Sequence, residues 1–385
     1  MEEYQINGFT VKMWSDSMDD FARKEVENLV SLPFAFKHIA LMPDVHAGKG
    51  MPIGTVLATE NVVIPNAVGV DIGCGMCLLR TSIKVEDVTT EVLRKKIMRG
   101  IRKQIPLGRN HHRQRQDESF MPKQFDIDNM TIVKRQYLAA LKQIGTLGGG
   151  NHFIELQKCP DGYFWVMIHS GSRNLGKKVC DFYNEIAEKY VDEKYVDMQL
   201  AYLHTDNEFA QQYWNEMEYC IAFAKENRNL MMSRVKDVLT DVFLDVQFNI
   251  LDISHNYAAK EMHFGKEVIV HRKGAIRAYK DDMGIIPGSQ GSNSYVVKGL
   301  GNADSFCSSS HGAGRALSRT DAINTLSLED EITRLNKLNI VHSVRFKGDL
   351  EEATGAYKDI GKVMDNQKDL VKPVMELFPI AVIKA

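Results

Sequence analysis

The chain has 385 residues, 44% of them hydrophobic, and its 48 basic and 50 acidic side chains leave a formal net charge of −2. This is ample material for a large core, and the near-neutral balance argues against a protein coated with nucleic acid, although it allows a local basic groove. Six cysteines are too few for a disulfide scaffold. The acidic first residues have no apolar run behind them, and no stretch approaches the ~18 apolar residues of a membrane span, so we expect a cytoplasmic protein without a signal peptide or membrane contact.

The first part of the chain is predicted to begin with a helix and continue into strands. An amphipathic helix is expected over residues 16–31, with Ser15 or Asp16 as its cap. From His38 to Ser82, short apolar runs alternate with glycine, proline and asparagine, which is typical of strands and loops. These runs are Thr55–Ala58, Val62–Ile64 and Val68–Ile72.

The middle of the chain is predicted to be mainly helical. Residues 88–103 have a basic helical pattern, and residues 104–125 are polar and expected to form a loop. Residues 163–169 predict a buried strand that ends on a histidine. Between about 176 and 247, glycines are few and apolar residues recur three and four apart, which indicates helices. Residues 249–315 return to a glycine-rich pattern of strands and loops.

The last segment is predicted to hold two helices, residues 328–338 and 358–376, and a short strand, Pro379–Lys384. No internal repeat, low-complexity tract or linker-like run interrupts the chain. We therefore expect an α+β fold with a mixed β-sheet core, built as a single domain over residues 1–385, with the helical region at about 176–247 lying within it.

Chemistry-bearing residues concentrate in five glycine-rich segments. Glycine lets the backbone approach a ligand closely, and successive backbone N–H groups in such loops bind anions. A histidine, cysteine or aspartate beside such a loop would put a metal ion next to a phosphate, and metals of the manganese and zinc kind accept mixed N, S and O ligands. Two such ions suit phosphoryl and nucleotidyl transfer. The segments are Val70–Cys77, Gly145–Glu155, His169–Arg173, Ser254–Asn256 and Ser310–Arg315.

Each segment alone has an ordinary explanation. A lone loop histidine is more often a hydrogen-bonding residue than a metal ligand. Cys74 and Cys77 could form a redox pair or half of a zinc site, but no second CxxC pair exists, so a four-cysteine site is excluded. We expect Cys74 to be the ligand and Cys77 to pack. The loop at 145–150 is not a Walker A loop, because no Gly-Lys-Ser/Thr follows it.

Taken together and in this order, the segments resemble the RtcB-type RNA-splicing ligases over nearly the whole chain. Asp44, His46 and their neighbours look like the first signature of that family. The matching stretches are Met42–Gly50, Asp71–Met76, Gly145–Glu155, His169–Arg173, His255-Asn256, Arg272–Ala275, Ile286–Ser289 and Ser310–Arg315. Gln290 stands where the family often has methionine.

The resemblance implies a set of site residues. It implies that Asp71, Cys74, His152, His169 and His255 hold two Mn²⁺ ions per subunit, with the thiolate shared between them. His311 would be the nucleophile that becomes linked to GMP. The nucleotide would contact Asn151, Glu155, Ser289, His311, Gly312, Ala313, Gly314, Tyr357 and Lys384.

The remaining implied residues contact phosphate or support the site. Arg173 and Arg315 would meet phosphate or RNA, since arginine makes forked contacts with phosphate oxygens. Asp44 would orient other site residues, with Asn256 also in support. Lys384 could donate to guanine O6 and so select GTP over ATP, although a lysine next to the C-terminus is ordinarily frayed.

The resemblance implies a GTP- and Mn²⁺-dependent RNA ligase that joins RNA 3′-phosphate or 2′,3′-cyclic phosphate ends to 5′-hydroxyl ends, in RNA repair or tRNA splicing. An accessory activation protein is a possible partner of such a ligase. Two alternatives stay open: a metal-dependent RNA-end phosphoesterase, which would not need His311 or Lys384, and a non-enzymatic RNA-end-binding protein. Zinc would also fit the Cys/His ligands by softness alone.

Three further features have two explanations each. The nine Lys and Arg residues between Arg94 and Arg115 form either a solvated face or a groove for the RNA backbone. His271 follows an apolar run, and we expect a hydrogen-bonded core histidine there. Cys307, four residues before His311, is either packing or a further ligand.

Overall fold

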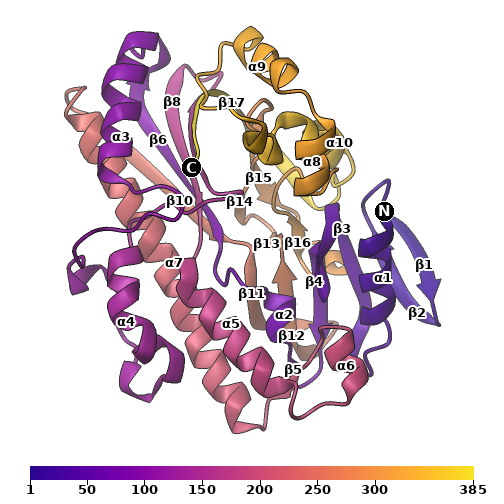
Figure 1. The fold of residues 1–385 in the computed structure, drawn as a ribbon. Coiled ribbons are helices and arrows are strands. Elements are labelled where there is room, and N and C mark those ends of the chain that lie inside the picture. Colours follow the sequence, from indigo (N-terminus) through magenta and orange to yellow (C-terminus); the bar gives the residue numbers. More distant parts are fainter.

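The computed structural model, which describes residues 1–385, has two main β-sheets (Figure 1). The first sheet has six strands in the order β1-β2-β3-β4-β12-β11. Its pairs are antiparallel except β2 with β3, and helix α1 (Asp20–Leu29) provides the crossover that a parallel pair requires. The strands are β1 (Glu2–Ile6), β2 (Phe9–Met13), β3 (Ala35–Lys49), β4 (Met51–Thr59), β11 (Asn256–His263) and β12 (Lys266–Lys273).

The second sheet has seven strands, all antiparallel, in the order β10-β6-β8-β7-β17-β15-β14. It therefore joins segments from the first, middle and last parts of the chain. Its strands are β6 (Gly75–Lys84), β7 (Phe153–Lys158), β8 (Tyr163–Ser170), β10 (Phe248–Ser254), β14 (Met283–Ile286), β15 (Ser294–Gly299) and β17 (Val371–Ile383). Short strand pairs are formed by β5 (Val62–Val63) with β9 (Leu203–His204) and by β13 (Ala275–Arg277) with β16 (Ser308–Ser310).

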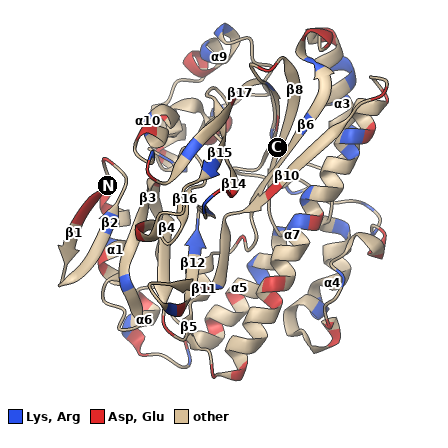
Figure 2. Ribbon diagram, turned by 180° about the vertical axis from the view of Figure 1, so that it is seen from behind, with Lys and Arg blue, Asp and Glu red and all other residues tan.

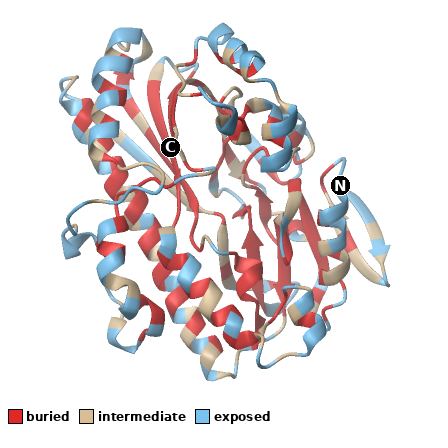
Figure 3. Cartoon of the chain, viewed as in Figure 1, coloured by how far each residue is buried: buried red, intermediate tan, exposed pale blue.

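Helices α4, α5 and α7 gather on one side of the molecule, and α8, α9 and α10 gather on another (Figure 1). The longest helix, α7, packs against β6, β8 and β10 of the second sheet and against α5. Buried residues concentrate in the strands and on the inner faces of the helices (Figure 3). The helices are α2 (Pro65–Val68), α3 (Arg99–Gln104), α4 (Thr131–Gln143), α5 (Arg173–Ala187), α6 (Glu193–Asp197), α7 (Glu208–Thr240), α8 (Arg319–Thr325), α9 (Leu328–Lys337) and α10 (Ile360–Asp365). No helix combines the length and the apolar character needed to cross a bilayer.

The structure confirms the α+β class and most of the predicted elements. The basic helix at 88–103 is found as a π-helical segment, Val92–Met98, that continues into α3. The strand at 163–169 is β8, the region 176–247 holds α5, α6 and α7, and residues 328–338 hold α9. Helix α4 was not predicted.

Three predictions were wrong in detail. The first helix is capped by the Asp19 side chain, which accepts from the backbone N–H of Ala22, and not by Ser15 or Asp16. The run Val68–Ile72 is not a strand, because Pro65 starts the short helix α2 and a turn follows it. Residues 358–376 do not form one helix: α10 ends at Asp365 and the long strand β17 begins at Val371, since the apolar residues there pair with β7 and β15.

A buried ion pair between α7 and β10 anchors this helix to the second sheet. Arg228 is fully buried, and its Nη2 and Nε atoms each lie 2.7 Å from a carboxylate oxygen of Asp252 in β10. Its Nη1 also donates to the carbonyl oxygens of Gly73, at 2.9 Å, and Ser170, at 3.1 Å. The guanidinium thus meets both charge and hydrogen-bonding needs inside the protein, which a buried ion requires.

We expect Arg228→Leu to lower the free energy of unfolding by about 3–5 kcal/mol, because Asp252 and the two carbonyl groups lose their partner. Urea denaturation followed by circular dichroism measures this loss. The control is Lys95→Ala, which breaks an ion pair with Glu91 whose side chains are 74% and 73% exposed, and which should cost less than about 1 kcal/mol. Equal losses for the two variants would contradict this role of Arg228.

Candidate active site

Strand register brings the predicted metal ligands together from four separate segments. His169, near the end of β8, lies opposite Met76 of β6 and opposite Phe153 of β7. Cys74 directly precedes β6, and His152 directly precedes β7, so both reach the end of the sheet where His169 lies. His255 connects β10 to β11, and its backbone N–H donates to the carbonyl oxygen of Cys74 at 2.8 Å. The cluster therefore forms at one end of the second sheet.

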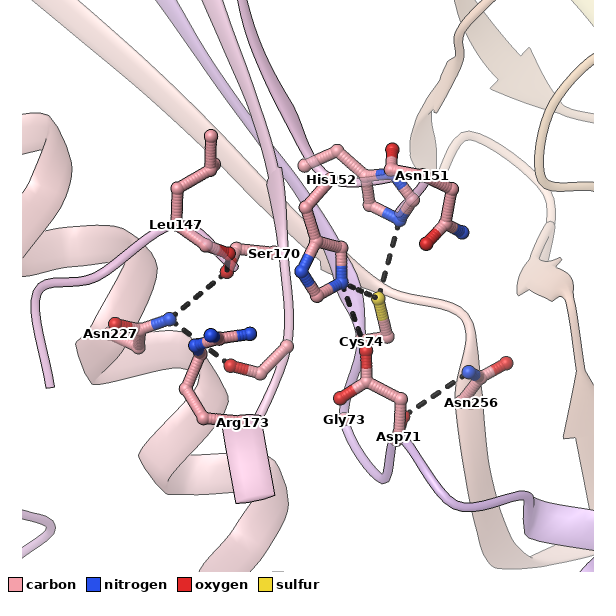
Figure 4. Close-up of polar contacts among 12 residues, drawn as sticks. Asp71, Gly73, Cys74, Leu147, Asn151, His152, Ser170, Arg173, Asn227 and Asn256 are labelled. Carbon is pink, nitrogen blue, oxygen red and sulfur yellow. Dashed lines mark hydrogen bonds and ion pairs between the residues drawn. The ribbon is translucent and has the colours of Figure 1, made fainter. Parts of the chain in front are cut away.

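The donor atoms lie within contact distance of one another (Figure 4). The Cys74 Sγ atom is 3.5 Å from His152 Nε2 and 3.3 Å from His169 Nε2. His152 Nε2 is also 3.0 Å from Asp71 Oδ2. The ring of His255 lies with its centroid 5.2 Å from that of His169. Cys74, His152 and His169 thus form a compact donor group with Asp71 and His255 beside it, and manganese or zinc accepts such donors.

Burial keeps the imidazoles of His169 and His255 neutral, and some donor atoms of the cluster have no protein partner. Burial and the neighbouring histidines hold the pKa values of His169 and His255 well below the usual value, so their ring nitrogens carry lone pairs at neutral pH. His169 Nδ1 lies 3.0 Å from the carbonyl oxygen of Asn151, which turns Nε2 toward Cys74. Asp71 Oδ1 and His255 Nδ1 are buried and have no hydrogen-bond partner in the protein. These unpaired atoms fit a bound cation.

Two glycines are required where backbone passes close to this cluster. At Gly148, with φ +99°, a Cβ atom would lie 2.0 Å from Arg173 Nη1 and 2.5 Å from His152 Nδ1. At Gly171, a Cβ atom would lie 2.2 Å from Asp71 Oδ1. Any larger residue would displace the donor atoms, so the glycines that accompany the histidines in the sequence serve close approach, as predicted.

Side chains outside the glycine-rich segments hold these loops, and sequence analysis missed them. Asn227 of α7 is fully buried. Its Oδ1 accepts from the backbone N–H groups of Gly145, at 2.8 Å, and Thr146, at 3.1 Å, and its Nδ2 donates to Ser170 and Gly171 (Figure 4).

The predicted supporting residue Asn256 acts in a comparable way from the other side of the cluster. Its Nδ2 donates to the carbonyl oxygen of Asp71 at 3.2 Å, and its Oδ1 accepts from Gly274 at 2.8 Å. Asn256 therefore joins the turn before β6 to the turn after β12.

His311 lies next to this cluster and is held by a buried carboxylate. Asp44 Oδ2 lies 2.6 Å from His311 Nδ1 and accepts from the backbone N–H groups of His311, at 3.0 Å, and Gly312, at 3.3 Å. A carboxylate on Nδ1–H leaves the lone pair of the imidazole on Nε2. The ring centroid of His311 is 4.7 Å from that of His255, so the two rings are neighbours. His46, two residues after Asp44, has its pKa lowered to about 4 by burial and is neutral.

A single cavity of about 670 Å³ brings His311 together with every residue predicted to bind nucleotide. The register of β7 with β17 explains one wall, because Glu155 lies opposite Val382 and alternation places Phe153 and Lys384 on the same face. The predicted residues on the lining are Asn151, Glu155, Ser289, His311, Gly312, Ala313, Gly314, Arg315, Tyr357 and Lys384, with His169 and His255.

Glu155 and Glu352, the two acidic side chains near Lys384 in the cavity, have opposite electrostatic environments. Burial raises the pKa of Glu155 to about 8, although the amide of Gln157 at 2.6 Å and the charge of Lys384 counteract it. Burial would also raise the pKa of Glu352, but Lys384, Tyr357 and Arg315 outweigh it and hold that pKa below its usual value. Glu352 was not predicted from the sequence.

Arg173 does not line the cavity. It is the first residue of α5, and its guanidinium donates to Thr146 Oγ1 at 3.2 Å and to the carbonyl oxygen of Gly108 at 3.4 Å. It lies beside His152, since Arg173 Nη1 and His152 Nδ1 both lie close to Gly148 (Figure 4). His271 is a fully buried core histidine, as expected, since its Nε2 accepts from Ile64 and its Nδ1 contacts Leu57. Cys77 packs in the hydrophobic core.

Comparison with known proteins finds similarity over almost the entire chain. The sequence profile described as tRNA-splicing ligase RtcB matches residues 25–385. The chain is 37% identical to the RNA-splicing ligase RtcB of Escherichia coli strain K12, over 97% of both chains. It is 31% identical to the tRNA-splicing ligase RtcB of Methanococcus maripaludis, over 98% of this chain and 94% of the relative. It is also 31% identical to the protein of that name from Thermococcus kodakarensis, over 95% and 91%.

We expect the purified protein to bind Mn²⁺, and Cys74→Ala to bind it at least about tenfold more weakly, because the thiol contacts two of the three histidines in the cluster. Isothermal titration calorimetry measures both affinities. The control is Cys77→Ala, which removes a buried thiol three residues away and should leave the affinity unchanged. Equal affinities for the wild type and Cys74→Ala would show that the ion lies elsewhere.

Proposed function

The chain belongs to the RtcB family, and on that premise we propose that it is a GTP- and Mn²⁺-dependent RNA ligase. It would join RNA 3′-phosphate or 2′,3′-cyclic phosphate ends to 5′-hydroxyl ends, in RNA repair or tRNA splicing. The observation that carries the proposal is His311, held by Asp44, in a cavity large enough for a nucleotide, with the donor cluster reaching that cavity through His169 and His255.

The donor cluster fits a metal that holds phosphate. Asp71, Cys74, His152, His169 and His255 would hold two Mn²⁺ ions. The bound ions would polarise the α-phosphate of GTP and offset the charge that develops on it. Neutral imidazoles and buried donor atoms without protein partners support this assignment.

His311 would act as the nucleophile. Its Nε2 lone pair attacks the α-phosphorus of GTP, a nitrogen–phosphorus bond forms, and the bond to the β-phosphate oxygen breaks to release pyrophosphate. Asp44 on Nδ1–H keeps the lone pair on Nε2 and stabilises the positive charge that the ring gains.

The later steps transfer the GMP group. The RNA 3′-phosphate attacks the His311–GMP adduct, which restores the imidazole and gives a 3′-guanylylated RNA. The 5′-hydroxyl of the second RNA end then attacks this activated phosphate, and GMP leaves as the phosphodiester bond forms. A 2′,3′-cyclic phosphate end would first be opened to a 3′-phosphate.

The far end of the cavity would recognise guanine. Lys384 would donate to O6, where adenine has a donor in place of an acceptor, and the ring of Tyr357 would stack on the base. Glu155 faces Lys384, so it would accept from N1–H and the N2 amino group on the same edge of the base. Asn151, Ser289 and the Gly312–Gly314 backbone would contact the rest of the nucleotide, with Arg315 near phosphate.

The basic segment that includes α3 supports an RNA partner. Of the nine Lys and Arg residues between Arg94 and Arg115, only Lys95 forms an ion pair. Partial burial and the charge of Arg345 lower the pKa of Arg102. Basic residues lie along α3 in Figure 2. Cations without an acidic partner favour an anionic partner such as an RNA backbone.

The phosphoesterase alternative uses the same cluster but gives no role to His311. In that enzyme a water molecule would be the nucleophile, and a carboxylate that holds a histidine beside the cluster would be unnecessary. The lysine and stacking ring at the base end would also be unused. The ligase therefore accounts for more of the cavity.

We expect the wild type to become labelled when it is incubated with Mn²⁺ and α-labelled GTP, and His311→Ala to remain unlabelled. The label should be acid-labile, as a nitrogen–phosphorus bond is. Asp44→Asn should slow labelling by about 10²-fold or more, because the imidazole loses its orienting carboxylate. Denaturing electrophoresis measures the adduct.

A wild type that binds Mn²⁺ at Cys74 but takes no label would contradict the ligase and favour the phosphoesterase. The control for folding is the melting temperature of His311→Ala, which should remain close to that of the wild type, since the side chain of His311 lines the cavity and lies outside the core.

GTP binding should release a proton from Glu155 at pH 7. In the free protein the pKa of this carboxyl is about 8, and the facing groups are Lys384 and the Gln157 amide. It must be ionised to accept from two guanine donors, so GTP affinity should rise as pH increases toward 8 and level off above it. Calorimetry of Mn²⁺-loaded protein in buffers of different ionisation enthalpy counts the protons. Glu155→Gln should release none from this group, and an unchanged count would refute the assignment.

A further inference from the structure

Glu352 is a buried carboxylate at the base end of the cavity, and the mechanism above leaves it without a role. It ends the 3-10 segment Lys347–Glu352, five residues before Tyr357. A buried carboxylate is retained in a folded protein only where charged or polar partners offset the loss of hydration. The partners of Glu352 are therefore informative about what it does.

The two oxygens of Glu352 have separate partners. Oε2 accepts from Lys384 Nζ, at 2.9 Å, and from the hydroxyl of Tyr357. Oε1 faces arginines, with Arg315 Nη1 at 3.2 Å and the more exposed Arg319 Nη2 at 3.9 Å. One oxygen therefore binds the lysine and the ring that would contact guanine, and the other binds the arginine that would lie near phosphate.

Lys384 needs such a partner. It follows the last residue of β17, so strand pairing does not fix its long side chain. A flexible lysine loses rotamer freedom when it must hold one position against a base. The contact with Glu352 removes that freedom before any ligand arrives, which is preorganisation.

Fixing the lysine also affects which base fits. A held ammonium group presents donors at one place, where guanine has the O6 acceptor and adenine has an amino group. If the lysine were free, it could turn away from adenine and the penalty against adenine would fall. Tyr357 is held by the same oxygen, so the donor and the stacking ring keep a fixed mutual position.

We propose that Glu352 is a positioning residue that sets the preference for guanine by holding Lys384 and Tyr357 on one carboxylate oxygen. This inference rests on the proposed function, because it assigns Lys384 to guanine. It adds a residue that touches neither the base nor the reacting phosphate and acts through two that would touch the base.

The test measures self-guanylylation by wild type and Glu352→Gln in the presence of Mn²⁺, with GTP and with ATP. Glu352→Gln should raise the GTP concentration that gives half the maximal rate of adduct formation about tenfold. It should change the maximal rate constant by less than about twofold, since His311 and Asp44 are untouched. The ratio of the second-order rate constants for GTP and for ATP should fall. Glu352→Asp, which keeps the charge on a shorter side chain, should lie between the two and also serves if the glutamine variant is unstable.

A double-mutant cycle with Lys384→Met separates positioning from a merely structural role. If Glu352 acts through Lys384, Glu352→Gln should add little to the loss already caused by Lys384→Met. The matched control is Glu331→Gln, another buried carboxylate, which contacts Thr354 and Gln290 and does not contact Lys384. It should lower the melting temperature without changing the ratio of GTP to ATP use.

The outcomes are distinguishable. Additive losses in the cycle, or unchanged base preference in Glu352→Gln, would overturn the role of Glu352 while the wild type still formed its adduct with GTP. A wild type that formed no adduct would overturn the proposed function itself.

Discussion

The site depends on hydrogen bonds from two neighbouring side chains of α7 to loop backbone. Asn227 and Arg228 are both fully buried, and together they bind backbone groups of Gly73, Gly145, Thr146, Ser170 and Gly171. Glycine-rich loops lose much conformational freedom when they are ordered, so they need such partners to hold one conformation. These five residues belong to the segments that carry Asp71, Cys74, His152 and His169. The helical region, which looks like an interruption of the sheets in the sequence, therefore supplies the framework of the proposed metal-binding cluster.

The same type of side chain takes different roles in different parts of the site because its surroundings differ. Asp44 has three N–H donors on one oxygen and orients His311. Glu155 is buried with few donors, and its pKa of about 8 leaves it able to gain or lose a proton near neutral pH. Glu352 faces Lys384 and Arg315 and stays ionised. Burial and the number of hydrogen-bonding or charged partners determine the role of each carboxyl group. The sequence alone does not distinguish these three acidic residues.

The structure brings Cys74, His152 and His169 together, whereas several elements were predicted wrongly. Histidines beside glycines mark positions where backbone can approach a ligand, and that local signal singled out their segments, while the resemblance to the RtcB family implied that they share metal ions. Glu352 gives no such signal, because its importance depends on the pairing of β17 with β7, which brings Lys384 to it from 32 residues away. Asn227 and Arg228 lie on the buried face of α7 that includes Cys220, Phe223 and Ala224. Their polar character on this apolar face is the only signal in the sequence that points to their role. Residues 371–376 were mistaken for helix because strand pairing there overrides local propensity.

His255 lies where the chain passes from one sheet to the other, and this position links the two halves of the chemistry. Strand β10 belongs to the second sheet and β11 to the first, with only His255 between them. The cluster of Asp71, Cys74, His152 and His169 is attached to the second sheet, whereas Asp44 belongs to β3 of the first sheet and holds His311. The ring of His255 lies 5.2 Å from His169 on one side and 4.7 Å from His311 on the other, measured between ring centroids. The distance between the proposed nucleophile and the proposed ions is therefore set by how the two sheets pack. Because His255 is the only residue between β10 and β11 and its ring is buried, this distance can vary little.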